Sequence, residues 1–190
     1  MNYYGKHRDD RDGYVYSPII KQYDASFWKS ISGTPAMSGN LLRFTSASAG
    51  TFLQHIYADL EVLLTIPAKP TAGDSRKWGF ILPDSSNMGA AYFEISGAVF
   101  QCVTKDIYGN TQTTAVTWND AAWSGNPITY RINWEAEQVI FYVNGEIVAV
   151  HSTKTNAETP NMALSIEIVN GNADNMDLTY LAIRRAASII

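Results

Sequence analysis

The chain has 190 residues, of which 46% are hydrophobic, 12% aromatic and 17% charged. This composition supplies enough apolar material for a folded core and fits one large β-sandwich. The net charge is −4 and no basic block is present, which excludes nucleic acid as a partner. No stretch approaches the ~20 consecutive apolar residues of a membrane-spanning helix, so membrane insertion is excluded as well.

The start of the chain carries a dense charge run, Lys6–Asp12, in which the two signs nearly balance. Such a run is typical of a solvated arm or a docking tail. We therefore expect an N-terminal arm at residues 1–13 and a single domain at residues 14–190. The first residues lack the apolar segment of a secretory signal. We expect the protein to be located on a virion or at an extracellular surface that it reaches without a signal peptide, or otherwise in the cytoplasm.

After the arm, short runs of β-branched and aromatic residues alternate with clusters of Gly, Asn, Asp, Ser and Pro, and helical periodicity is hard to find. The runs that predict strands are residues 14–20, 41–45, 51–56, 60–66, 78–82, 90–95, 99–105, 113–118, 129–134, 139–143, 147–152, 162–169 and 177–184. The pattern predicts an all-β fold, an antiparallel sandwich of two sheets with little or no helix.

Two connections in this series are informative. Residues 68–75 look most like a linker, but strands of the same character continue on both sides, so we interpret them as a long loop within one domain. Asn144-Gly145 stands between two alternating apolar runs, which is the strongest short-range signal of a β-hairpin. With the run at 129–134, this hairpin predicts a meander of three antiparallel strands.

The same region resembles a known superfamily. Tyr130-Arg131-Ile132-Asn133-Trp134, followed by the run from Val139 to Gly145, resembles strands of the concanavalin A-like lectin/glucanase sandwiches. Trp78-Gly79-Phe80 and Tyr92-Phe93-Glu94-Ile95 resemble further strands of that superfamily, in the same order. The resemblance covers residues 40–185 and implies a jelly-roll sandwich of the concanavalin A-like kind. It concerns core positions, and a shared fold does not by itself imply a shared function.

The hydrolase branch of this superfamily carries its catalytic carboxylates as Glu-x-Asp-x-(x)-Glu on one strand. Alternate residues of a strand point to one face, so such carboxylates flank a single glycosidic bond. Here Glu94 is followed two residues later by Ser96, and Glu167 stands alone on its strand. Glu135 and Glu137 lie in a predicted turn. The missing motif predicts that the chain is not an enzyme, with a divergent glycoside hydrolase as an alternative.

Alternation also predicts a ligand-binding face. The residues assigned to the core are Ile81, Phe93, Ile95, Phe100 and Cys102. The residues assigned to the opposite, outer face are Trp78, Tyr92, Glu94 and Gln101. A face of aromatic rings with amide and carboxylate groups suits a sugar, because its C–H face stacks while its hydroxyls form hydrogen bonds. Trp123, in the loop after Trp118, is a further candidate. Alternatively, a loop or a neighbouring subunit covers these aromatics.

One loop concentrates oxygen ligands of the kind that calcium takes. Its candidate ligands are Asn170, Asn172, Asp174 and Asp177. Asn, Asp and Gly also dominate ordinary turns, which is the alternative interpretation. No other cofactor is expected.

Together these observations favour a non-catalytic recognition or assembly module with lectin-like binding to carbohydrate or a surface, as in a decoration, fibre or tail component of a phage-type virion. The alternatives are a purely structural virion subunit without a glycan ligand and the divergent glycoside hydrolase. The expected partners are a glycan or neighbouring protein subunits, with the chain part of an oligomer or a larger assembly.

Overall fold

The structure is a computed structural model that describes residues 14–16, 29–33, 35–52, 57–81, 89–106, 108–135, 138–153 and 165–185. The predicted arm at residues 1–13 lies outside the described residues, as do parts of four predicted strands, at 17–20, 53–56, 82 and 162–164.

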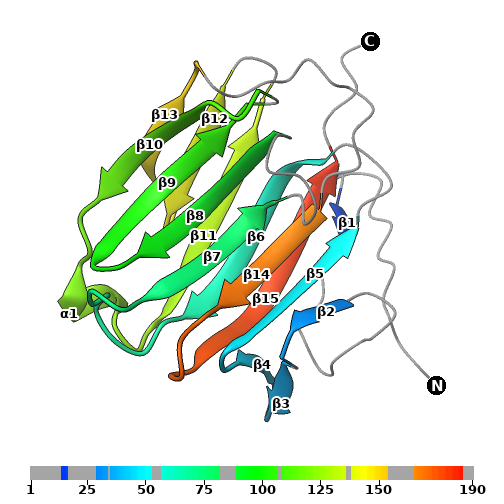
Figure 1. Cartoon of the computed structure of the whole chain (residues 1–190). Coiled ribbons are helices and arrows are strands. Elements are labelled where there is room, and N and C mark those ends of the chain that lie inside the picture. Colours follow the sequence, from blue (N-terminus) through cyan, green and yellow to red (C-terminus); the bar gives the residue numbers. More distant parts are fainter. Residues whose placement is uncertain are drawn as a thin grey trace.

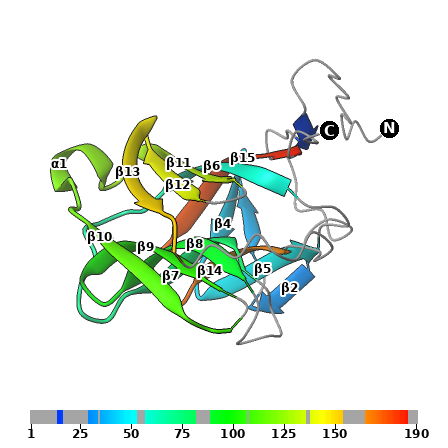
Figure 2. The same cartoon turned by 90° about the horizontal axis from the view of Figure 1, so that it is seen from above.

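The described strands form two antiparallel sheets that lie against each other as two layers (Figure 1, Figure 2). The eight-stranded sheet has the order β13 (Glu146–His151), β12 (Val139–Val143), β11 (Pro127–Trp134), β6 (Tyr57–Thr65), β15 (Met176–Arg185), β4 (Leu41–Phe44), β3 (Ala36–Ser38), and β1 (Tyr14–Tyr16) pairs with β15. The seven-stranded sheet has the order β10 (Thr111–Val116), β9 (Val99–Lys105), β8 (Ala90–Ser96), β7 (Ser75–Phe80), β14 (Ser165–Asn170), β5 (Ala47–Phe52), β2 (Lys29–Ser32). The predicted two-sheet sandwich is confirmed.

Aromatic and branched side chains from alternate strand positions fill the space between the sheets. Trp78 of β7 is fully buried there, and its ring stacks on Phe93 at 5.8 Å and on Phe100 at 6.0 Å between centroids. Tyr130 reaches it from the opposite sheet, edge to face, at 4.9 Å. Full burial stabilises the fold by roughly 1.5–3 kcal/mol per large apolar side chain, so this aromatic cluster holds the two layers together.

The predicted meander is present as β11, β12 and β13. Its tight turn has positive φ at both central residues, 51° at Asn144 and 83° at Gly145, as a two-residue hairpin requires. The side-chain oxygen of Asn144 also accepts a hydrogen bond from the backbone N–H of Thr129 at 3.0 Å. This bond connects the turn between β12 and β13 to β11.

Three described elements have no counterpart in the sequence prediction: β2, β3 and the short helix α1 (Asp120–Trp123). The two strands have only four and three residues, too few to show a period of two. The helix is a single turn that begins after Asn119, whose side chain accepts from the Ala122 N–H. Within the ranges described above, no helix has the length and apolar character needed to cross a bilayer.

Candidate active site

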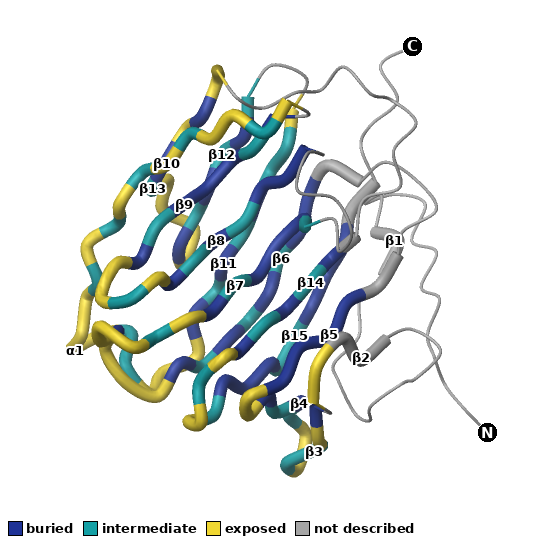
Figure 3. The backbone as a smooth tube through the Cα atoms, in the orientation of Figure 1, coloured by how far each residue is buried: buried dark blue, intermediate teal, exposed yellow. Residues whose placement is uncertain are grey.

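The candidate site lies on the outer face of the seven-stranded sheet, which is the face turned away from the core. Strand β8 buries Phe93 and Ile95 completely, so the alternate residues Tyr92 and Glu94 project from the outer face. The alternation of burial along the central strands can be followed in Figure 3. This follows from the sequence, because a run with a period of two can bury only one of its faces.

Glu94 is held by its direct partners on both neighbouring strands. Lys77 of β7 and Gln101 of β9 are its register partners in the two ladders. The Lys77 ammonium lies 3.2 Å from one carboxylate oxygen, and the Gln101 amide donates to the other at 2.7 Å. Directly opposed side chains of opposite charge or complementary polarity are the favourable cross-strand pairs. The Glu94 carboxylate is therefore fixed in orientation while remaining 16% exposed.

Tyr92 supplies a phenol beside this carboxylate. The Lys77 ammonium lies 5.6 Å from the centre of its ring, within the range of a cation–π contact. Burial, and secondarily the negative charge of Glu94, raise the pKa of Tyr92 to about 12. Tyr92 therefore remains a protonated hydrogen-bond donor at any physiological pH.

A second carboxylate comes from a different strand. Glu167 of β14 is flanked in the ladders by Gly79 of β7 and Gly50 of β5, so no side chain projects beside it from either neighbouring strand. Burial raises the pKa of Glu167, whereas the charge of Lys77 acts in the opposite direction. The outer-face cluster consists of Lys77, Tyr92, Glu94, Gln101 and Glu167.

The cluster occupies a sheltered part of the face. Gly79 is the register partner of both Tyr92 and Glu167, so these three residues form one row across β8, β7 and β14. Gly79 is buried although it belongs to the outer face, and the outward-facing Val103 of β9 is also buried. Shelter from water strengthens electrostatic interactions with a bound ligand.

The structure corrects the predicted position of Trp78. The prediction assigns Ile81 of this strand to the core, and the structure instead points Arg76, Trp78 and Phe80 inward. Strand β7 ends at Phe80, so Ile81 does not take part in its alternation. Trp78 fills the centre of the core and cannot contact a ligand on the outer face. In β8 and β9 the assignment was right, and Tyr92, Glu94 and Gln101 lie together on the predicted face.

Trp123 is not brought to this face. It ends α1, and its ring contacts the inward-facing Phe100 at 6.0 Å and Trp118 at 5.4 Å, both edge to face. Half-buried, it packs against the margin of the core.

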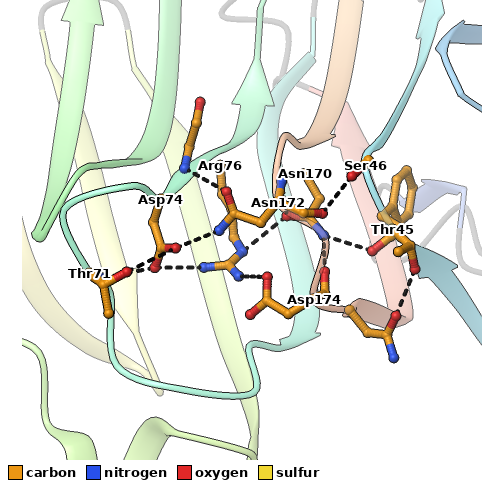
Figure 4. Close-up of polar contacts among 11 residues, drawn as sticks. Thr45, Ser46, Thr71, Asp74, Arg76, Asn170, Asn172 and Asp174 are labelled. Carbon is orange, nitrogen blue, oxygen red and sulfur yellow. Dashed lines mark hydrogen bonds and ion pairs between the residues drawn. The ribbon is translucent and has the colours of Figure 1, made fainter.

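The predicted calcium ligands have protein partners instead (Figure 4). The Arg76 guanidinium, on a side chain only 1% exposed, lies 2.5 Å from Asp174, 3.3 Å from Asp74 and 3.2 Å from the side-chain oxygen of Asn170. The side chain of Asn172 accepts from the Ser75 N–H and donates to Asp74. The Arg76 cluster consists of Asp74, Arg76, Asn170, Asn172 and Asp174.

The fourth candidate ligand, Asp177, forms a two-pronged ion pair with Arg43, both bonds being 2.7 Å long. In the described part of the chain, no three His, Cys, Asp or Glu side chains lie close enough together to hold a metal ion. The oxygen-rich loop thus accepts hydrogen bonds from arginines and backbone N–H groups, as in the alternative interpretation of an ordinary turn region.

Sequence reasoning missed Lys77 and Glu167 as members of the site. The Ile-Glu-Ile alternation at 166–168 places Glu167 on the outer face, but the sequence does not show that β14 lies next to β7. That adjacency joins residues 86 or more positions apart, and together with the pairing of β7 and β8 it brings the two glutamates into one cluster.

Several solved structures share this fold. An apo Crh5 transglycosylase matches with a TM-score of 0.65 and 16% identity, over 90% of this chain and 84% of the other. A Bacillus licheniformis beta-glucanase matches with a TM-score of 0.67 and 15% identity, over 92% and 99%. The catalytic domain of a Thermotoga petrophila RKU-1 endo-1,3-beta-glucanase (laminarinase) has a TM-score of 0.68 and 14% identity, over 90% and 98%. No curated protein matches the chain.

The sequence itself matches the family described as Glycosyl hydrolases family 16 over residues 80–184, which is more than half of the chain. This match confirms the resemblance to concanavalin A-like lectin/glucanase sandwiches. It overturns the expectation that the chain is not an enzyme, which rested on the missing carboxylate motif. It also supports the glycoside hydrolase alternative over the lectin-like virion module. The chain belongs to the glycosyl hydrolases of family 16.

Proposed function

We propose that the chain cleaves or transfers β-linked glucan chains on the outer face of the seven-stranded sheet, with Glu94 as a catalytic carboxylate. The observation that carries the proposal is the setting of Glu94, held by Lys77 and Gln101 and projecting from a central strand within the region that matches the family. The choice of substrate follows the solved structures of similar fold, which are a β-glucanase, a laminarinase and a transglycosylase.

The neighbours of Glu94 suit a sugar ligand. The Tyr92 ring can stack against the C–H face of a pyranose, while its hydroxyl donates a hydrogen bond. Gln101 keeps the Glu94 carboxylate in one orientation through a single hydrogen bond at 2.7 Å. A fixed carboxylate is what an attack on an anomeric carbon, or the stabilisation of positive charge there, requires.

The test is hydrolysis of β-1,3- and β-1,3-1,4-linked glucans by the purified chain, with product analysis that also detects transfer to longer chains. We expect Glu94→Gln to lower kcat by on the order of 10⁴-fold, the scale seen when a nucleophile or its base is removed. The matched control is Glu146→Gln, an exposed carboxylate on β13 of the opposite sheet. Full activity of Glu94→Gln would remove Glu94 from this role, and an inactive wild-type chain would refute the proposal itself.

A further inference from the structure

The hydrolase branch carries its carboxylates on one strand, but β8 offers only Glu94, because its next outward position is Ser96. A glycosidase needs two carboxyl groups, one to donate a proton and one to act as nucleophile or base. The second must therefore come from a neighbouring strand of the same face. The outward position of β14, two ladder steps from β8, is occupied by Glu167.

The glycines beside Glu167 give its carboxyl group access to a ligand. Side chains on adjacent strands normally crowd one another at ~5 Å between Cβ atoms, but positions 50 and 79 carry none. At Gly79 this is enforced by the fold, since φ is 151° and an added Cβ would lie 2.6 Å from the Tyr92 Cα. The row of Tyr92, Gly79 and Glu167 thus presents a phenol and a carboxyl group on the two sides of a bare backbone.

The surroundings of the two carboxyl groups differ, because burial favours the neutral form of Glu167 whereas Glu94 is held in a direct ion pair. The ammonium of Lys77 lies in a direct ion pair with Glu94, and its attraction for Glu167 is outweighed by burial. The next outward residue of β14 is Val169, and on β5 the outward positions are Ser48 and Gly50. Lys29 of β2 is the register partner of Gly50 one strand further away. Two carboxyl groups in such different environments are suited to two different roles, one as the proton donor and the other as the anion.

We infer that Glu167 supplies the second carboxyl group of the site as its general acid, from β14, so that the catalytic pair spans two strands with Lys77 on the strand between them. This inference rests on the proposed function. It names a residue that contributes to the reaction from a strand other than the one that carries Glu94.

The proposed reaction has two steps, and Glu94 and Glu167 act in both. A carboxylate oxygen of Glu94 bonds to the anomeric carbon while the glycosidic C–O bond breaks, its electron pair passes to the leaving oxygen, and the Glu167 proton moves to that oxygen. Glu167, now a carboxylate, takes a proton from water, or from the hydroxyl of an acceptor glucan. The oxygen of that molecule bonds to the anomeric carbon, which frees Glu94 as a carboxylate and leaves Glu167 protonated again.

The experiment compares two substrates in the Glu167→Gln variant: a β-glucan, whose alcohol leaving group needs protonation, and a 2,4-dinitrophenyl β-glucoside or oligoglucoside, whose leaving group does not. We expect kcat/KM on the glucan to fall by about 10²–10⁴-fold, the usual contribution of a general acid. On the activated substrate, we expect the rate of the first, bond-breaking step to fall less than about tenfold. The alkaline limb of the pH–rate profile should disappear with the side chain that titrates.

The outcomes separate the inference from the proposed function. Suppose that the wild-type chain is active and Glu94→Gln is inactive. If Glu167→Gln then loses activity equally on both substrates, or on neither, the inference is wrong and the proposed function stands. If the wild-type chain cleaves neither substrate, both are wrong. Circular dichroism and the melting temperature of each variant show whether it is folded, and Glu167→Asp, which retains a shorter acid, should recover part of the glucan activity but not exceed the wild type.

Discussion

The two charged clusters of the seven-stranded sheet differ in how fully their charges are satisfied. In the Arg76 cluster, one cation that is 1% exposed has two carboxylates and an amide oxygen as partners. In the outer-face cluster, one cation that is 41% exposed has two carboxyl groups near it, of which only Glu94 forms an ion pair with it. The first cluster surrounds its cation, whereas the second leaves carboxyl groups available.

This difference matches the positions of the two clusters in the fold. Arg76 lies in the inward-facing row of β7, where an uncompensated charge would be costly. The loops at 71–74 and 171–175 and the end of β14 at Asn170 lie around it (Figure 4). Lys77, the next residue, faces outward and can remain partly hydrated. Adjacent residues of one strand therefore serve the two faces of the sheet: one fixes the end of the sandwich, and the other sets the charge of the site.

The largest expected effect is on stability, from Arg76→Met. Removing one partner of a buried ion pair costs about 3–5 kcal/mol, and we expect the lower end, about 3 kcal/mol, because Asp174 is 46% exposed and can be hydrated. Urea unfolding measures the change. The matched variant Lys77→Met breaks a more exposed pair and should cost less than about 1 kcal/mol. Equal losses in the two variants would contradict the contrast between the clusters.

A smaller effect is expected from Gly79→Ala, which tests the bare backbone between Tyr92 and Glu167. The added Cβ would meet the backbone of Ala91 and Tyr92 at 2.6 Å, and the resulting shift or strain should cost about 1–3 kcal/mol. Activity should fall as well, because β7 and β8 can no longer keep their present spacing.

The control for this variant is Gly73→Ala, where an added Cβ has open space. Its unfolding free energy should stay within about 1 kcal/mol of the wild type, with any change towards higher stability, because alanine narrows the unfolded ensemble. If Gly79→Ala has the same melting temperature as this control, β7 tolerates a side chain at position 79, between Tyr92 and Glu167.

Local alternation made part of the site predictable. In β8 and β9 the inward residues Phe93, Ile95, Phe100 and Cys102 are all apolar. The outward position of Tyr92, Glu94 and Gln101 can therefore be read from the sequence. Strand β7 mixes charged and aromatic residues, and its inward row begins with Arg76. A buried arginine followed by a buried tryptophan gives no apolar stripe to identify, and the face assigned to Trp78 was therefore wrong.

The rest of the site depends on which strands become neighbours. Glu167 and Gly79 are register partners because β14 lies between β7 and β5, and loop-spanning contacts of this kind leave no local pattern. The same holds for the loop at 170–177, whose oxygen atoms suggest calcium until Arg76 and Arg43 are placed beside them. The sequence reasoning also did not show that the chain belongs to a family of hydrolases although β8 carries a single glutamate.

The smallest expected effect concerns Glu167 and connects stability with the proposed reaction. Because burial raises its folded-state pKa above the ordinary value of 4.5, the unfolded chain releases this proton at lower pH than the folded chain does. Stability therefore falls as pH rises from about 4.5 through the folded-state pKa, and the loss persists at neutral pH. Glu167→Gln should raise the melting temperature at pH 7 by at most ~2–4 °C, the shift that about 1 kcal/mol causes at this chain length.

Below pH 4 the two proteins should melt alike, because Glu167 is then protonated in both states. Differential scanning calorimetry from pH 3.5 to 8 measures the gap, with Glu146→Gln as the exposed control. A gap of opposite sign at pH 7 would mean that the attraction of Lys77 outweighs burial, so that Glu167 is ionised and unsuited to donate a proton. If Glu167→Gln is more stable than the wild type and yet loses glucan cleavage, Glu167 lowers the stability of the fold while it contributes to activity. A purely structural role for Glu167 does not explain that combination.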